Sequence, residues 1–90
     1  MNESKYERMS IEDFDKYVNV RIEIEHLQEK GIVKRTGVIT KYTTGDRKIS
    51  QNSKTIEDRI PFVCEFEDDE LQQIDKIPVR NIRDIEIINE

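Results

Sequence analysis

The residues of this chain that could do chemistry are its cations, which gather in the middle third. Residues 30–59 carry eight basic and three acidic side chains, whereas residues 1–29 carry four and eight and residues 60–90 carry three and nine. A segment of charge +5 between acidic flanks can contact a polyanion such as nucleic acid, or a docking protein. The same split also arises on ordinary solvated loops, and both interpretations stay open. The side chains predicted to contact phosphates or carboxylates are Lys34, Arg35, Lys41, Arg47 and Lys48.

Catalytic and metal-binding residues are scarce. The single histidine, His26, falls in a predicted hairpin turn, and the chain has neither a nucleophile motif nor a glycine-rich phosphate loop. The acidic run from Glu65 to Glu70 lacks the spacing of a calcium loop, and one histidine with one cysteine cannot complete a zinc site. Cys64 is predicted to be a small buried hydrophobe. We therefore expect a protein that is not an enzyme and has no cofactor or metal.

The composition allows one small core. Hydrophobic residues make up 34% of the 90 residues and charged residues 39%, so the core must come from a few dense segments rich in Ile and Val. No stretch reaches the length of a membrane span, and the first residues lack the apolar run of a signal peptide. The sequence predicts one cytoplasmic domain over residues 10–90 after a flexible tail of residues 1–9, with no membrane partner.

The elements that must position these side chains are mostly short strands. Ser10 followed by Asp13 is a helix-capping pattern and predicts a short helix over residues 10–16. Strict alternation predicts a half-buried strand over residues 17–25, and Gly37 indicates a bulge or bend in the next strand. The polar stretch of residues 43–58 is predicted to be a long mobile loop. The remaining strands are predicted over residues 32–42, 60–66, 71–79 and 85–88.

The closing run has an apolar spacing that changes from two to three and back. Val79, Ile82 and Ile85 are three residues apart, which is the period of a 3-10 turn between two strands. All three side chains should then face one core. Together with the short strands and the bend at Gly37, this predicts a mainly β fold, a small five-stranded barrel of the SH3-like or Sm-like kind with a short N-terminal helix.

Two stretches carry a family resemblance. Lys30-Gly-Ile-Val-Lys-Arg-Thr-Gly-Val-Ile-Thr-Lys-Tyr42 and Lys76-Ile-Pro-Val-Arg-Asn-Ile-Arg-Asp-Ile-Glu-Ile87 resemble the central hairpin and closing motif of the YolD-like proteins. That resemblance covers residues 20–88. It implies an accessory protein of bacteria or their phages, associated with Y-family DNA polymerases and the response to DNA damage.

The resulting functional hypothesis is a bacterial or phage accessory module that binds a nucleic acid or a protein through its basic middle third. Two alternatives stay open. The acidic residues Glu65 to Glu70, with Asp84 and Glu86, could dock on a basic host protein, as a phage inhibitor does. Exposed strand edges could instead assemble an Sm-like ring that binds RNA.

Overall fold

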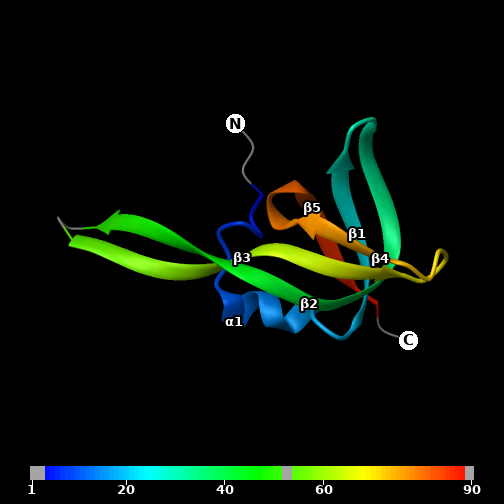
Figure 1. The fold of residues 1–90 in the computed structure, drawn as a ribbon, viewed down its shortest axis with the longest axis horizontal. Helices are drawn as coiled ribbons and strands as arrows, with labels where there is room; N and C mark the ends of the chain where they lie inside the picture. Colours follow the sequence, from blue (N-terminus) through cyan, green and yellow to red (C-terminus); the bar gives the residue numbers. More distant parts are fainter. Residues whose placement is uncertain (1–3, 52–53, 89–90) are drawn as a thin grey trace.

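The computed structural model describes residues 4–51 and 54–88, apart from the side chains at positions 47, 49–51 and 55–58. Within that part of the chain, five strands form one antiparallel sheet in the order β4-β3-β2-β1-β5 (Figure 1). The predicted mainly β class is confirmed. The strands are β1 Arg21–Gln28, β2 Gly31–Gln51, β3 Lys54–Asp68, β4 Ile74–Pro78 and β5 Ile82–Ile87.

The predicted N-terminal helix is confirmed as one turn of α-helix, α1 Ile11–Phe14, which continues into a 3-10 turn, η1 Asp15–Tyr17. The Ser10 hydroxyl accepts a hydrogen bond from the backbone N–H of Asp13 at 3.2 Å, as the capping pattern predicts. Phe14 is buried, and its ring meets that of Tyr42 edge to face at 5.1 Å. A short helix with little stability of its own is thus held on the sheet by aromatic packing.

The predicted 3-10 turn is also confirmed, as η2 Val79–Asn81 between β4 and β5. Val79, Ile82 and Ile85 all point into the core, with exposed fractions of 1%, 0% and 6%. Pro78 is the last residue of β4, a position where the missing backbone N–H of proline costs the sheet little. The change of spacing in the sequence was therefore a correct signal of local geometry.

The predicted closure into a barrel is wrong. β4 and β5 are the two edges of an open sheet, and they are joined through η2 without a ladder between them in the described residues. The outer edge of β5 is covered instead by the N-terminal segment. The backbone N–H of Ile85 donates to the Tyr6 hydroxyl at 2.8 Å, and the Ser4 hydroxyl donates to the Ile82 carbonyl at 2.5 Å. Since these edge groups already have partners, β5 does not need β4 to satisfy them.

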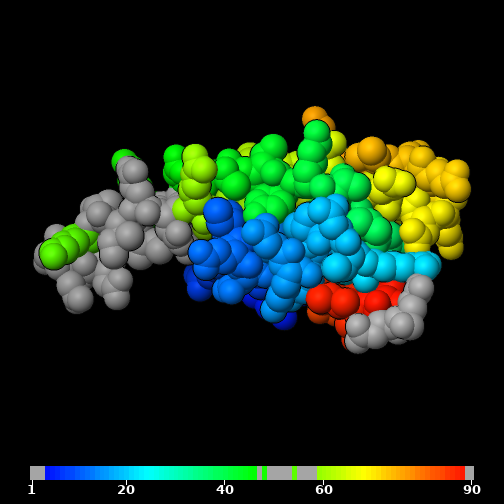
Figure 2. Space-filling view, turned by 90° about the horizontal axis from the view of Figure 1, so that it is seen from below, coloured from blue at the N-terminus to red at the C-terminus, as the bar shows by residue number. Residues whose placement is uncertain are grey.

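The first described residues are packed against the sheet by these contacts. The sequence predicts a flexible tail over residues 1–9, but Ser4 and Tyr6 are buried, and the Tyr6 ring packs edge to face on Tyr17 at 5.8 Å. Residues 1–3 lie outside the described part. Figure 2 shows the N-terminal segment and α1 (blue) packed across the middle of one face of the molecule. Tyr6 can be buried in the core because its hydroxyl group reaches the edge of β5 and accepts a hydrogen bond there.

Residues 43–58 also differ from the prediction. β2 and β3 continue through this stretch as a paired hairpin, in register from Thr43 opposite Val63 to Gln51 opposite Lys54, and it projects as an arm from the rest of the molecule (Figure 1). Residues 52–53 lie outside the described part. The prediction of a loop failed because it relied on apolar alternation, which this polar stretch lacks, whereas the pairing of β2 and β3 continues through it by backbone register.

The core lies between the sheet, the N-terminal segment and η2. Gly37 does not mark the bulge, because the register of β2 and β3 shifts at residues 39–41 and again at residues 43–44. A Cβ added at Gly37 would lie 2.1 Å from the Glu67 carbonyl oxygen, so the glycine permits a close approach of β3.

No helix in the described part of the chain is long and apolar enough to cross a membrane. The buried hydrophobic residues are Tyr6, Phe14, Tyr17, Ile22, Ile24, Ile39, Cys64, Phe66, Ile77, Val79, Ile82 and Ile85.

Candidate binding cleft

Two of the predicted contact residues, Lys34 and Lys41, are paired with carboxylates on neighbouring strands. The Lys34 Nζ lies 3.3 Å from a carboxylate oxygen of Glu25, its direct cross-strand partner, and the Lys41 Nζ lies 3.4 Å from Glu65, its partner on β3. The hydrogen bond with Glu25, followed by the charge of Glu23, raises the pKa of Lys34. The basic middle third and the acidic flanks are thus complementary within the sheet, because basic β2 lies between β1 and β3.

Arg47 and Lys48 lie further along β2, on the projecting arm. The Lys48 side chain is exposed. The backbone of Arg47 pairs with that of Asp58, and its side chain lies outside the described residues. The five predicted cations therefore do not form one gathered site.

Arg35 makes the most extensive contacts of the four whose side chains are described. Because side chains alternate along a strand, it points to the opposite face of β2 from Lys34. Its Nε donates to Asp68 at 2.7 Å and its Nη2 donates to Asp75 at 2.5 Å, and its guanidinium lies 5.2 Å from the centre of the Phe66 ring. Only 13% of the side chain is exposed. Arg35 thus connects β2 to β4 and to Asp68, the last residue of β3 before the turn.

Asp68 organises that turn. One of its carboxylate oxygens accepts the backbone N–H groups of Glu70 at 2.8 Å and Leu71 at 3.0 Å, while the other accepts Arg35. The Leu71 hydrogen bond, followed by that of Arg35, lowers the pKa of Asp68. The acidic run that the sequence presents as a solvated turn therefore contains a buried carboxylate with a structural role.

His26 is misplaced by the sequence prediction, which puts it in a turn. It lies in β1, in phase with Ile22 and Ile24, and is 4% exposed. The alternation of residues 17–25 extends one step further and could have revealed this. Burial, and then the charge of Arg35, lowers the pKa of His26, so the ring is neutral at neutral pH. Its Nε2 is buried and makes no hydrogen bond with any described residue.

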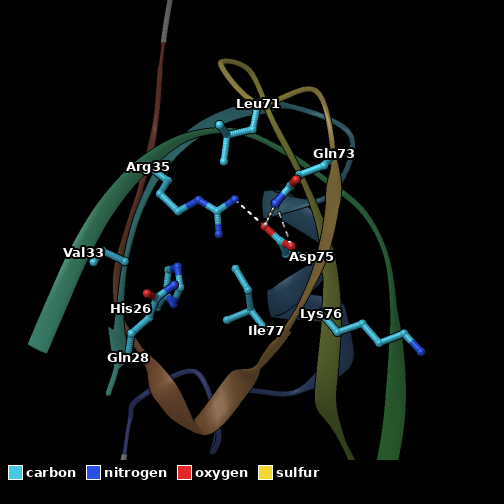
Figure 3. A pocket seen from close by; sticks show the side chains of 9 residues that line it. All are labelled: His26, Gln28, Val33, Arg35, Leu71, Gln73, Asp75, Lys76 and Ile77. Atoms are coloured by element: carbon cyan, nitrogen blue, oxygen red, sulfur yellow. Dashed lines mark hydrogen bonds and ion pairs between the residues drawn. The ribbon is translucent and has the colours of Figure 1, made fainter. Parts of the chain in front are cut away.

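These groups line a cleft of about 490 Å³ between β1 and β2 on one side and β4 with its preceding turn on the other. Figure 3 shows His26, Arg35 and Asp75 converging on it from three strands, with Ile77 opposite the histidine. Gln73 donates to both Asp75 oxygens at 3.3 Å. The lining residues are His26, Gln28, Val33, Arg35, Leu71, Gln73, Asp75, Lys76 and Ile77.

No family model, curated protein or solved structure matches this chain. The site must therefore be interpreted from its own chemistry. Among the described residues, no group of three or more His, Cys, Asp or Glu side chains is placed to hold a metal ion.

A second hollow, of about 410 Å³, lies at the base of the arm. Pro61, Phe62 and Pro78 give it an apolar lining, and Phe62 is 54% exposed. Its polar residues Thr44, Asp46 and Arg80 are exposed and Glu7 is half-buried. Within the part of the chain that is described, it contains no buried unpartnered group of the kind found in the cleft. The cleft is therefore the stronger candidate site.

Proposed function

We propose that the protein is an accessory module without enzymatic activity, and that it binds a protein partner at the end of the sheet where the cleft opens. The observation that supports this most directly is the setting of the cleft. Four exposed apolar side chains lie in or next to the two turns at this end of the sheet. Leu71 lines the cleft, whereas Leu27, Ile32 and Ile74 alternate along their strands with residues that line it and so point to the other face. Exposed apolar side chains beside a few convergent polar groups are typical of recognition sites. The four exposed side chains are Leu27, Ile32, Leu71 and Ile74, with exposed fractions of 38%, 59%, 61% and 56%.

Nucleic-acid binding through the basic third has less support. Affinity for phosphates comes from cations that release counterions, and a cation already paired with a carboxylate gains less from a phosphate. Lys34, Arg35 and Lys41 are all paired in this way. The acidic docking hypothesis weakens for the same reason, because Glu65, Asp68 and Asp69 are each paired with a cation of the sheet.

Ring assembly would pair the edge strands β4 and β5 of neighbouring copies, and the edge of β5 is already occupied. The outer groups of β5 at Ile82 and Ile85 are bonded to the N-terminal segment, so pairing there would first require that segment to leave. We keep an Sm-like ring as an outcome of the size measurement below.

The resemblance to YolD-like proteins names a Y-family DNA polymerase as the partner to try first. A photo-crosslinking residue placed at Leu71 of the full chain should form an adduct with purified polymerase, and one placed at Lys48 on the arm should not. Adding Ile74→Asp to the Leu71 probe should abolish the adduct. An adduct at position 48 alone would contradict the proposed face.

The nucleic-acid alternative is tested by gel shifts at low and high salt with single-stranded and duplex DNA and RNA. We expect no salt-sensitive complex. A complex that weakens steeply with salt and is lost in Lys48→Gln would contradict the proposal, as would a ring-sized particle in light scattering.

A further inference from the structure

Among the described residues, Nε2 of His26 is the one buried side-chain nitrogen or oxygen that lacks a hydrogen-bond partner. A buried nitrogen without a hydrogen bond destabilises a folded protein by about 1–3 kcal/mol, and native structures contain few such groups. This one belongs to a residue that lines the cleft. An occupant with a complementary hydrogen-bonding group would supply the missing bond.

The charges around the cleft favour a neutral occupant. Arg35 and Asp75 carry opposite charges at the cleft and are bonded to each other, whereas the Lys76 side chain points away from it (Figure 3). An anion that approached Arg35 would also meet the Asp75 carboxylate, and a cation that approached Asp75 would meet Arg35. Because the two are bonded to each other, neither sign of charge gains a net attraction.

The hydrogen-bonding groups favour an occupant that can both donate and accept. Asp75 only accepts, and its side chain is 36% exposed, whereas Gln73 can do both. A neutral imidazole offers one donor and one acceptor. A carboxamide carries two N–H donors and a carbonyl acceptor in one plane, so it suits all three partners. Val33, Leu71 and Ile77 provide an apolar wall for the body that carries it.

We propose that the cleft is a binding site for a neutral carboxamide group, which lies beside His26 Nε2 and Asp75 with its apolar body against Val33, Leu71 and Ile77. The cleft volume of about 490 Å³ suits a compound of one or two rings. The amide can belong to a free small molecule or to a Gln or Asn side chain of a protein. This inference goes beyond the proposed function and does not require it, because it depends only on the cleft.

Three probes of the same shape test the charge argument. Benzamide, benzoate and benzamidinium are titrated into the isotope-labelled full chain, and binding is followed by the backbone amide signals and the ring nitrogen signals of His26. Benzamide should bind saturably, shift the Nε2 resonance and perturb Gln73 and Asp75. Benzoate and benzamidinium should each bind about tenfold more weakly, since specificity is a difference of two affinities. Equal binding of all three, or shifts confined to the hollow at Phe62, would overturn the proposal.

A matched pair of variants tests the histidine. His26→Phe keeps a ring of similar size but has no nitrogen, and it should weaken benzamide binding about fivefold, the effect of one neutral hydrogen bond. Lys48→Gln, on the arm, should bind as the original chain does. If the phenylalanine variant does not fold, the ring nitrogen shift of the original protein decides, and an unmoved Nε2 signal refutes the proposal.

A second ligand distinguishes the two possible sources of the amide. N-acetyl-glutamine methylamide presents the amide of a protein side chain, and benzamide presents that of a free aromatic compound. Tighter binding of the glutamine derivative would assign the cleft to a protein side chain, and tighter binding of benzamide would assign it to a small molecule. Failure of both to bind would overturn the inference while leaving the crosslinking test at Leu71 unaffected.

Discussion

Gly37→Ala should lower the free energy of unfolding markedly, although it adds only one methyl group. Gly37 lies on β2 where β3 comes closest, and an added Cβ would be 2.1 Å from the Glu67 carbonyl oxygen and 2.8 Å from the tip of the Phe66 ring. Cβ contacts below 3.0 Å are essentially never found, so Gly37→Ala must push the two strands apart by about 1 Å. The same Phe66 ring supports the Arg35 guanidinium, so the strain reaches the wall of the cleft.

The size of the effect follows from two opposing contributions. Overpacking of a dense core typically destabilises by about 1–3 kcal/mol, and the upper part of that range applies because the clash involves backbone that cannot rotate away. Removing the conformational freedom of glycine from the unfolded chain offsets about 0.4–1 kcal/mol. The net loss in the free energy of unfolding should be about 2 kcal/mol, which lowers the melting temperature of a domain of this size by roughly 8–16 °C.

Gly45→Ala is the matched control. An added Cβ there would be 3.7 Å from Phe62 Cβ, an ordinary contact, and the residue does not have a positive φ. Its stability should stay within about 1 kcal/mol of the original chain. Both variants are compared by thermal and urea unfolding followed by circular dichroism. If Gly37→Ala melts at or above the temperature of Gly45→Ala, the close approach of β3 is not what requires glycine.

Three further predictions concern the groups that hold the sheet and its edge. The hydrogen bond from Arg35 lowers the pKa of Asp75 in the folded protein, so the unfolded state binds a proton at this carboxylate first as the pH falls. The stabilisation is therefore present above about pH 4 and is lost below it. Arg35→Met should make the loss of stability in acid shallower, as measured by urea titrations from pH 6 to 2. Tyr6→Phe leaves the Ile85 N–H without its acceptor and should destabilise by about 1–3 kcal/mol in urea unfolding; an unchanged midpoint would mean that the N-terminal segment does not protect β5. Burial raises the pKa of Cys64 to about 12, so a thiol reagent at pH 8 should modify it only after unfolding, and rapid modification of the native protein would disprove its burial.

Local signals in the sequence were sufficient for several elements. The capping pattern at Ser10 gave the helix start, and the spacing of Val79, Ile82 and Ile85 gave the 3-10 turn and three core positions. Both depend on contacts between residues a few positions apart, so a linear pattern records them directly.

The candidate site could not be found in this way. Arg35 is 33 residues from Asp68 and 40 from Asp75, and which acids it meets depends on the register of three strands. The sequence showed a basic segment between acidic ones, but the same composition suits a free cationic surface and a sheet in which the charges pair.

What the sequence alone determined is the type and order of most of the elements and several core positions, because apolar periodicity is a local property of the chain. The tertiary structure decided the open sheet, the paired arm and the cleft. A strand edge can be satisfied by a neighbouring strand or by side chains such as Ser4 and Tyr6, and only the packed molecule shows which partner is used. The unpartnered nitrogen of His26 is likewise a consequence of packing, because burial and the absence of a partner are properties of the space around a residue.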